Sequence, residues 1–320
     1  RYLRQIYNSS AKRVLLVAGR QVEKSTLLGN RILTHCTVNP FFRTLYVSPS
    51  HTQTKTFSRD RISEPILNSP VLRRMTTGTL LSNVLEKQFS NHSKITLRFA
   101  FLNADRCRGI PADEVCIDEF QDVLLESVPV IEECASHSKH KLFVYSGTPK
   151  SLDGPLEYYW TRLSTQNEWA VPCRAHGTPN NKSSWHWNIL DEENIGPEGL
   201  VCDHCRAPID SDDPDAQWTA LNPNVVASTV FEIYRIPQIM VPWINWNDVL
   251  HKQRVYGRSQ FKNEVLGRSY DVGVRPLTRQ DLIDNCNSEL SMRHYRKVKK
   301  YNVPIFMGVV GATTPVTPKD

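Results

Sequence analysis

Residues 14–26 of the chain are Val14-Leu15-Leu16-Val17-Ala18-Gly19-Arg20-Gln21-Val22-Glu23-Lys24-Ser25-Thr26. An apolar run, a short loop and a Lys-Ser pair predict a buried strand, a tight turn and the start of a helix. Backbone N–H groups at a helix start, together with the helix dipole, favour phosphate oxygens. A lysine there pairs with the β- and γ-phosphates, and the next hydroxyl ligates Mg²⁺. We therefore predict a P-loop for ATP and Mg²⁺ over Gly19, Arg20, Gln21, Val22, Glu23, Lys24, Ser25 and Thr26.

The loop departs from the usual P-loop pattern at two positions. Glu23 stands where glycine is usual, and Ala18 replaces the first glycine. A Cβ and a negative charge at position 23 crowd or repel phosphates unless the side chain points away or meets Arg20. We expect Glu23 to affect nucleotide affinity more than any other property.

A second element is the apolar strand Val115-Cys116-Ile117, which ends in Asp118-Glu119. In P-loop ATPases the first acid holds Mg²⁺ through water, and the second orients and deprotonates the attacking water. We assign Asp118 to the metal and Glu119 to the base. Two solvated acids at a turn are the alternative interpretation of the same pattern.

A third apolar strand runs into small polar residues at 142–149, where Ser146, Gly147 and Thr148 follow Tyr145. Hydroxyl groups at the carboxyl end of a strand, beside the acids, can sense the γ-phosphate and relay its loss. We predict a coupling motif at these three positions. Taken alone, the pattern equally fits a strand followed by a turn.

The order of elements predicts an α/β fold, a P-loop NTPase with a RecA-like, mainly parallel sheet flanked by helices. Predicted strands lie at 14–18, 44–48, 95–99, 115–117 and 142–146, and predicted helices begin near Ser25, Gln53 and Leu124. Residues 231–240 are strand-like, while 247–256 and 278–285 are helical in pattern. We divide the chain into an ATPase core at 1–160, an insertion at 161–225, the remainder of the ATPase domain at 226–290 and a basic linker at 291–320.

The insertion has little periodicity, so we expect something other than a core to hold it. It contains Cys173-Arg174-Ala175-His176 and Cys202-Asp203-His204-Cys205. Two such pairs supply four N/S ligands for a tetrahedral, structural Zn²⁺. We predict Zn²⁺ on Cys173, His176, Cys202 and Cys205 in a zinc-ribbon-like fold, with His186 and His204 as rival ligands. Unrelated reduced cysteines are the alternative.

Bulk composition restricts function less. The chain has 320 residues and a formal net charge of +6, which is compatible with a polyanionic partner but does not require one. Its apolar runs are far shorter than the roughly 20 residues of a membrane-spanning helix. We expect an intracellular protein with no membrane partner. Because the sequence begins without methionine, we also expect a fragment of a longer polypeptide.

Taken in order, the motifs resemble the ATPase domain of tailed-phage terminase large subunits over roughly residues 13–282. The resemblance lies in Gly19-Arg20-Gln21, Lys24-Ser25-Thr26, Tyr46-Val47-Ser48-Pro49, Arg108-Gly109, Asp118-Glu119 and Ser146-Gly147-Thr148-Pro149. It implies an ATP-hydrolysing motor that forms a homo-oligomeric ring at the procapsid portal and moves double-stranded DNA inward. The implied partners are the portal protein and the small terminase subunit, and the implied location is the host cytoplasm.

The resemblance also implies residue roles. Arg20 is similar to the family's phosphate-contacting arginine, and Arg108 matches the proposed trans-acting arginine finger. A salt bridge to Glu23 is the alternative for Arg20. A plain surface arginine is the alternative for Arg108, and Arg106 could take the finger role instead. Gln5 and Tyr7 are candidates for contact with adenine.

In this family a linker leads to a nuclease whose first strand carries a metal-binding aspartate. Residues 303–311 resemble that strand, but Val310 stands where the aspartate is expected, so we predict no DNA cleavage by this chain. The basic tract 293–300 could contact phosphates, but we favour a solvated linker.

Two other functions remain open. A helicase-like remodeller would need a second RecA-like half, which the sequence does not show. A weakly hydrolysing nucleotide-binding module that docks on the portal or on DNA is the other alternative, with Glu23 as the cause of weak hydrolysis.

Overall fold

The computed structural model describes residues 2–76, 83–100, 103–177, 181–223 and 230–271. The predicted helix at 278–285, the basic tract at 293–300 and the predicted strand at 303–311 lie outside the described residues.

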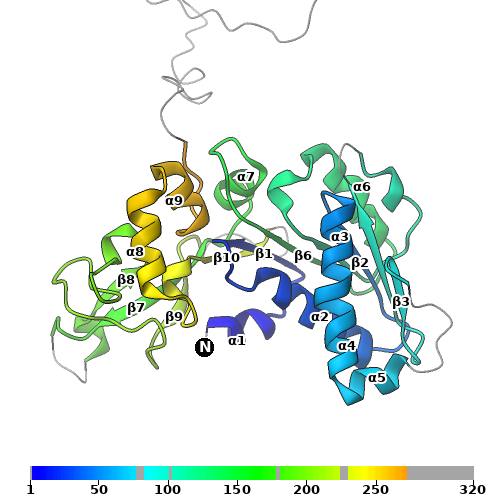
Figure 1. Ribbon diagram of the computed structural model, residues 1–320, viewed down its shortest axis with the longest axis horizontal. Coiled ribbons are helices and arrows are strands. Elements are labelled where there is room, and N and C mark those ends of the chain that lie inside the picture. The colour runs from blue at the N-terminus through cyan, green and yellow to red at the C-terminus, as the bar shows by residue number, and fades with distance from the viewer. Residues whose placement is uncertain (1, 77–82, 101–102, 178–180, 224–229, 272–320) are drawn as a thin grey trace, which may run out of the picture. The chain divides into compact units, whose positions relative to one another are not determined.

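The described chain forms one mixed sheet with strand order β3-β4-β2-β5-β6-β1-β10-β7-β8, and β9 pairs with β7. The consecutive strands from β4 to β10 in this order run parallel, whereas β3, β8 and β9 are antiparallel additions. Figure 1 shows the sheet crossing the described chain from β3 on one side to β8 on the other. The strands are β1 Arg13–Ala18, β2 Arg43–Ser48, β3 Glu86–Gln88, β4 Lys94–Phe99, β5 Glu114–Ile117, β6 Leu142–Gly147, β7 Asn167–Cys173, β8 His186–Ile189, β9 Gln217–Ala220 and β10 Glu232–Ile236.

Helices cover both faces of this sheet. Alternate residues of β1 enter two different apolar clusters, Leu16 on one face and Leu15 on the other. Both sides are therefore buried, as a parallel sheet requires. The cluster of Leu16 includes residues of α1, α2, α8 and α9, and that of Leu15 includes residues of α6 and α7. The helices are α1 Tyr2–Tyr7, α2 Lys24–Val38, α3 His51–Phe57, α4 Glu64–Asn68, α5 Pro70–Thr76, α6 Val128–Glu132, α7 Pro155–Arg162, α8 Trp246–Val255 and α9 Arg258–Glu264, with a π-helical turn at Ser58–Ser63.

The predicted fold class is confirmed, and each of the five predicted strands matches an observed strand to within one residue at either end. The helix predicted near Leu124 begins later, at Val128, where Pro129 occupies the first turn in which proline is tolerated. The strand predicted at 231–240 ends at Ile236, because Pro237 has no N–H to donate to a neighbouring strand.

The segment 161–225 shares the main core, contrary to our expectation that something else holds it. Strands β7, β8 and β9 extend the sheet beyond β10, and Trp169, Val171 and Trp218 pack in the same cluster as Leu16. β7 is buried at consecutive positions and so has no alternating pattern, and Asn167, Glu168 and Pro172 break its apolar run in the sequence. The division at 161 and 225 stays a prediction.

A buried ion pair joins the helix after the P-loop to the strand that carries the acids. The fully buried carboxylate of Glu114 lies 3.0 Å from Arg31 Nε and 3.0 Å from His35 Nδ1. Burial opposes ionisation of Glu114, but His35 and Arg31 outweigh it and hold the pKa of Glu114 below its usual value. This contact fixes α2 against β5, so it aligns the two halves of the site described next.

Candidate nucleotide site

The loop between β1 and α2 adopts the left-handed backbone conformation that glycine usually provides in a P-loop. Glu23, at the N-cap of α2, has φ 65° and ψ 25°, and Gln21 has φ 59°. A side chain in this left-handed region costs roughly 1–2 kcal/mol, which explains why glycine is usual there. Position 23 therefore keeps the usual conformation at the expense of backbone strain.

The Glu23 side chain turns toward the helix rather than toward Arg20. Thr26 Oγ1 donates a hydrogen bond to Glu23 Oε2. Arg20 Nε instead lies 3.4 Å from Glu264 Oε1 at the end of α9, and the Arg20 backbone N–H donates to the Glu264 carbonyl at 2.7 Å. The alternative of an Arg20–Glu23 salt bridge is thus absent from the described residues, and the loop is tied to α9.

Asp118 is the centre of a buried hydrogen-bond cluster at the end of β5. Its Oδ2 accepts from Ser25 Oγ at 2.9 Å and from Tyr46 Oη at 3.2 Å, while Ser146 Oγ donates to Oδ1. Burial raises the pKa of Asp118, although Lys24 and the hydrogen bonds from Ser146 and Ser25 oppose the rise. The cluster presents only oxygen donors, the set that suits Mg²⁺. Tyr46 is a contributor that our sequence reasoning used only as a family marker.

Glu119 lies beside Asp118 and is held from two sides. Lys24 Nζ is 3.0 Å from Glu119 Oε1, and Gln121 Nε2 donates to Oε2 at 2.6 Å. Burial favours the protonated acid, but Lys24 and Gln121 together lower the pKa of Glu119. An ionised carboxylate is the form that can accept a proton from water.

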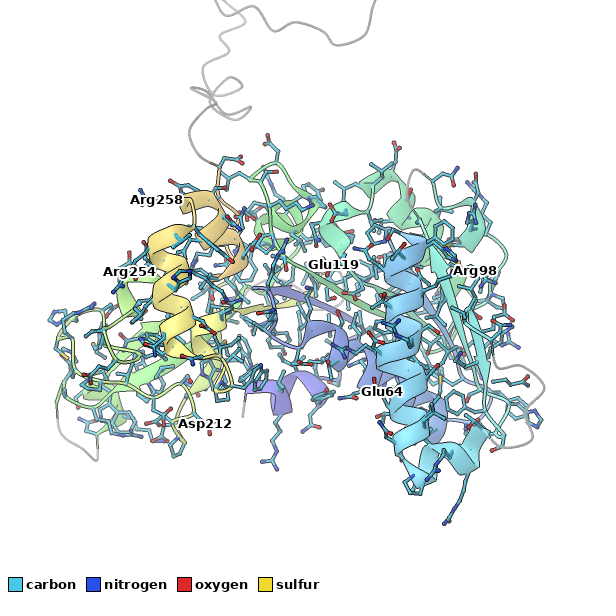
Figure 2. The ribbon with its side chains drawn as sticks, in the orientation of Figure 1. Glu64, Arg98, Glu119, Asp212, Arg254 and Arg258 are labelled. Atoms are coloured by element: carbon cyan, nitrogen blue, oxygen red, sulfur yellow. The ribbon has the colours of Figure 1, made fainter. Side chains whose placement is uncertain are left out.

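Four of these residues, Ser25, Tyr46, Asp118 and Glu119, line one cavity of about 240 Å³ at the carboxyl ends of the parallel strands. Ligands of open α/β sheets bind at this edge. Figure 2 shows Glu119 in the middle of the described chain. The cavity is lined by Ser25, Tyr46, Thr52, Gln53, Thr56, Phe57, Asp60, Arg61, Asp118 and Glu119.

A family model described as phage terminase large subunit gpA, ATPase domain, matches residues 2–221. The chain belongs to this family. Among solved structures, the large terminase ATPase domain of Thermus phage P74-26 is 16% identical with a TM-score of 0.57, covering 84% of this chain and 93% of that one. The large terminase of bacteriophage HK97 is 11% identical with a TM-score of 0.47, covering 82% and 48%. No curated protein matches the sequence.

The predicted coupling motif lies beside the acids. Ser146 contacts Asp118 across the neighbouring strands β5 and β6, and the Thr148 backbone N–H donates to Gln121 Oε1 at 3.0 Å. Gly147 lies between them at the end of β6. Of the residues predicted for coupling, Ser146 contacts Asp118 directly, and Thr148 is linked to Glu119 through Gln121.

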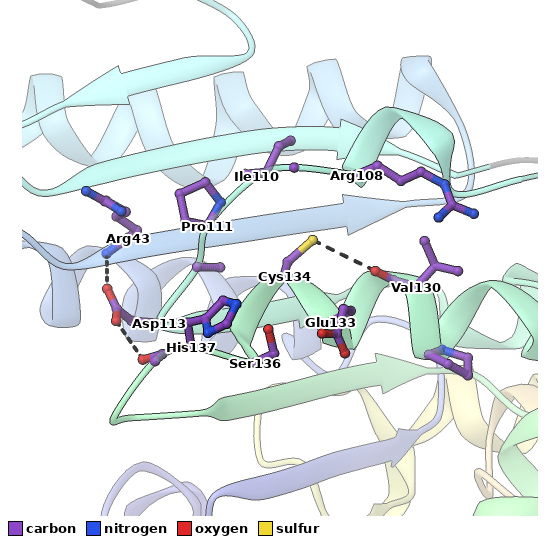
Figure 3. Close-up of a pocket in the computed structure, with 14 residues that line it drawn as sticks. Arg43, Arg108, Ile110, Pro111, Asp113, Val130, Glu133, Cys134, Ser136 and His137 are labelled. Carbon is purple, nitrogen blue, oxygen red and sulfur yellow. Dashed lines mark hydrogen bonds between the residues drawn. The ribbon is translucent and has the colours of Figure 1, made fainter.

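Arg108 lies apart from this site. It is exposed, pairs with Asp105 Oδ1 at 3.0 Å, and borders a separate pocket of about 700 Å³. Figure 3 shows Arg108 at one end of that pocket and Arg43 at the other. The rival Arg106 stacks over the Phe99 ring at 4.4 Å. The described chain does not bring Arg108 to its own nucleotide cavity, so its trans role stays a prediction.

The adenine candidates lie on α1. Gln5 and Tyr7 are both exposed, and Tyr7 Oη accepts a hydrogen bond from Asn30 Nδ2 of α2 at 3.0 Å. Their contact with adenine stays a prediction.

In the part of the chain that the structure describes, no helix is long and apolar enough to cross a membrane.

Replacement of Glu23 by glycine tests the strained loop. We expect Glu23→Gly to bind ATP at least as tightly as the parent chain, since it removes both a Cβ in the left-handed region and a negative charge near the phosphates. The melting temperature should not fall, because relief of strain offsets the extra freedom of glycine in the unfolded chain. Isothermal titration with ATP and thermal unfolding measure the two effects. Markedly weaker binding would show that the Glu23 carboxylate contributes to ATP binding. That result would contradict a side chain that points away from the phosphates.

Proposed function

We propose that this terminase ATPase domain hydrolyses ATP to translocate double-stranded DNA into a procapsid. The observation that carries the proposal is that Ser25 contacts Asp118 and Lys24 contacts the adjacent Glu119, and that Ser25, Asp118 and Glu119 line one cavity. These pairs are the metal-holding and water-activating parts of a P-loop ATPase. Family membership supports the coupling of hydrolysis to DNA packaging.

In this mechanism the chain's own residues have separate tasks. Lys24 leaves Glu119 for the β- and γ-phosphates, and Arg20 adds a second cation after release from Glu264. Ser25 and Asp118 would hold Mg²⁺, which neutralises charge on the phosphates. Glu119 then accepts the proton of the attacking water, and Ser146 links the metal ligand Asp118 to the coupling motif.

We further propose that the active form is a homo-oligomeric ring at the portal in the infected cell, with the small terminase subunit and double-stranded DNA as partners. In such a ring Arg108 reaches the nucleotide of a neighbouring subunit, where its guanidinium stabilises charge on the transferred phosphoryl group. The exposure of Arg108 supports this role, because a residue that acts in trans must lie on the surface.

Mg²⁺-dependent phosphate release by the purified chain, with and without duplex DNA, tests the proposal together with ATP-dependent DNA entry into procapsids. We expect hydrolysis that duplex DNA stimulates. Strand separation on a forked duplex would favour the helicase alternative instead. Bound ATP with no hydrolysis under any of these conditions would favour the assembly module.

We also propose a structural Zn²⁺ on Cys173, His176, Cys202 and Cys205. Their ligand atoms all lie within 4.8 Å of one another. The sulfur atoms of Cys173 and Cys205 are 3.7 Å apart. Zn–S bonds of about 2.3 Å in a tetrahedron imply a sulfur separation of about 3.8 Å, so the donors fit the ion. The rival His186 forms a second, mixed group with Cys202 and Asp203.

Metal analysis of the purified chain checks this zinc proposal. We expect about one Zn²⁺ per chain, reduced to nearly none in Cys202→Ser, with a lower melting temperature because a structural ion contributes folding free energy. Cys134→Ser is the matched control, since Cys134 lies outside the cluster. His186→Asn should keep the ion. A metal-free parent chain, or loss of zinc in His186→Asn alone, would contradict the assigned ligand set.

A further inference from the structure

Gln121 occupies a position between the predicted base and the coupling motif. Glu119 has φ 51°, and this left-handed residue turns the chain into the short 3-10 helix Phe120–Asp122. The turn brings the Gln121 side chain back toward Glu119. Its amide then makes three hydrogen bonds. Nε2 donates to Glu119 Oε2 at 2.6 Å and to Asp122 Oδ2 at 3.1 Å, and Oε1 accepts from the Thr148 backbone N–H at 3.0 Å. A single side chain therefore bridges the acid and the loop after β6.

Gly147 leaves the space that this bridge needs. A Cβ at position 147 would lie 2.5 Å from Gln121 Oε1, 3.0 Å from Leu156 Cδ1 and 3.3 Å from the Phe120 backbone nitrogen. A contact of 2.5 Å is too close, so any larger residue would displace the Gln121 amide or the strand end. The close approach of Gln121 therefore explains why glycine stands at position 147 of the predicted coupling motif.

The loop after β6 also contacts helix α9. Asn263 Nδ2 of α9 donates to the Lys150 carbonyl at 2.6 Å, and Lys150 Nζ pairs with Asp122 Oδ1 at 2.5 Å. A displacement of Gln121 would therefore reach α9 through a few hydrogen bonds. The same helix end holds Arg20 through Glu264.

We infer that Gln121 is a positioning residue that holds the Glu119 carboxylate for water activation and keeps Thr148 in register with it. The inference rests on the proposed ATPase function. Within the described chain, the side chains that contact the Glu119 carboxylate are those of Lys24 and Gln121. A bound triphosphate draws the Lys24 ammonium to the phosphates, which leaves Gln121 to orient Glu119 during hydrolysis.

Steady-state ATP hydrolysis by Gln121→Met tests this role. Methionine fills a similar volume but makes none of these hydrogen bonds. We expect kcat to fall by about 10- to 100-fold, the usual effect of a catalytic group that loses its alignment. KM for ATP should stay within about threefold, because Gln121 has no predicted contact with phosphate. Gly147→Ala should show the same separation of kcat from KM. Gln253→Met, on the exposed surface of α8, is the matched control.

Gln121→Glu adds a readout that a merely structural role would not change. A glutamate at position 121 has the same shape and can still accept from Thr148, but when ionised it cannot donate to Glu119 or Asp122 and repels both. We expect kcat to fall at least as far as in Gln121→Met, while KM for ATP stays within about threefold.

The outcomes separate this inference from the proposed function. A parent chain that does not hydrolyse ATP overturns the proposed function. A parent that hydrolyses ATP while Gln121→Met keeps its kcat, with normal melting temperatures for both, overturns the role of Gln121. A Gln121→Glu protein that keeps the kcat of the parent overturns the hydrogen bond to Glu119 as the cause of the loss.

Discussion

Glu119→Gln is expected to lower the rate of ATP hydrolysis by about 10²- to 10⁴-fold while ATP still binds, because a general base contributes about this much. The neutral amide keeps the shape of the side chain but cannot accept a proton from water. The ionised state of Glu119 is favoured in the folded chain, since Lys24 and Gln121 lower its pKa against the effect of burial. Lys24 would also lose its ion pair in the variant and become freer to meet the phosphates.

Phosphate release in single-turnover and steady-state conditions measures this effect, and titration with a labelled ATP analogue measures binding. Glu126→Gln is the matched control, since Glu126 is exposed at the start of a 3-10 turn away from the cavity. We expect the control to keep the parent rate. Hydrolysis by Glu119→Gln within a few-fold of the parent would show that another group activates the water.

The sequence predicted the parallel core because each central strand is a continuous apolar run, a signal that needs no knowledge of distant residues. The residues of the candidate nucleotide site were predicted for the same reason. Residues at the ends of β1, β5 and β6 must meet at one sheet edge, and the structure places Ser25, Asp118 and Ser146 in one hydrogen-bonded cluster there.

Contacts between distant segments could not be predicted in this way. The partner of Arg20 is Glu264, at the end of α9, and no local pattern links the two positions. The bridge through Gln121 depends on the left-handed conformation of Glu119, which is rare for a residue other than glycine. The strands β7, β8 and β9 escaped prediction because β7 has polar residues in a continuously buried strand, and β8 and β9 are only four residues long and do not alternate in burial.

The Glu23 position shows how a local departure can be tolerated. The backbone keeps the conformation usual for glycine, while Thr26 binds the carboxylate on the helix side. The strain is met by contacts around the loop, including the hydrogen bonds from Gly19 to Ile236 and from Arg20 to Glu264. Strained backbone of this kind persists where the surroundings fix it, often at functional sites.

Asp118→Asn is expected to abolish most hydrolysis, by at least about 100-fold, because the proposed metal ligand is lost. It should also make the nucleotide-free protein more stable, because a buried charge is removed. Burial raises the pKa of Asp118 in the folded chain above its unfolded value. Such a group favours folding when protonated, and this contribution is lost as the pH rises through the folded pKa. Above the folded pKa the ionised carboxylate therefore costs stability, and the neutral amide does not.

Thermal unfolding of the parent and of Asp118→Asn across a pH series checks the sign of the stability change. A gain of about 1 kcal/mol would raise the melting temperature of a domain of this size by about 2–4 °C. The gain should be largest in the alkaline range and should shrink as the pH falls, when Asp118 itself takes up a proton. The hydroxyls of Ser25, Tyr46 and Ser146 can rotate to serve the amide, so the cluster need not lose its hydrogen bonds.

A saturating, non-hydrolysable Mg²⁺–ATP analogue should reverse this order of stability. Ligand at about 100 times its Kd stabilises the parent by about 2.7 kcal/mol, whereas the variant lacks the carboxylate that would hold the ion and gains less. The parent then melts at the higher temperature, and Glu126→Gln should follow the parent in both conditions. An Asp118→Asn protein that is less stable without nucleotide would show that the ionised carboxylate is well solvated by its hydroxyl partners. Equal stabilisation of both proteins by the analogue would instead remove Asp118 from the metal site.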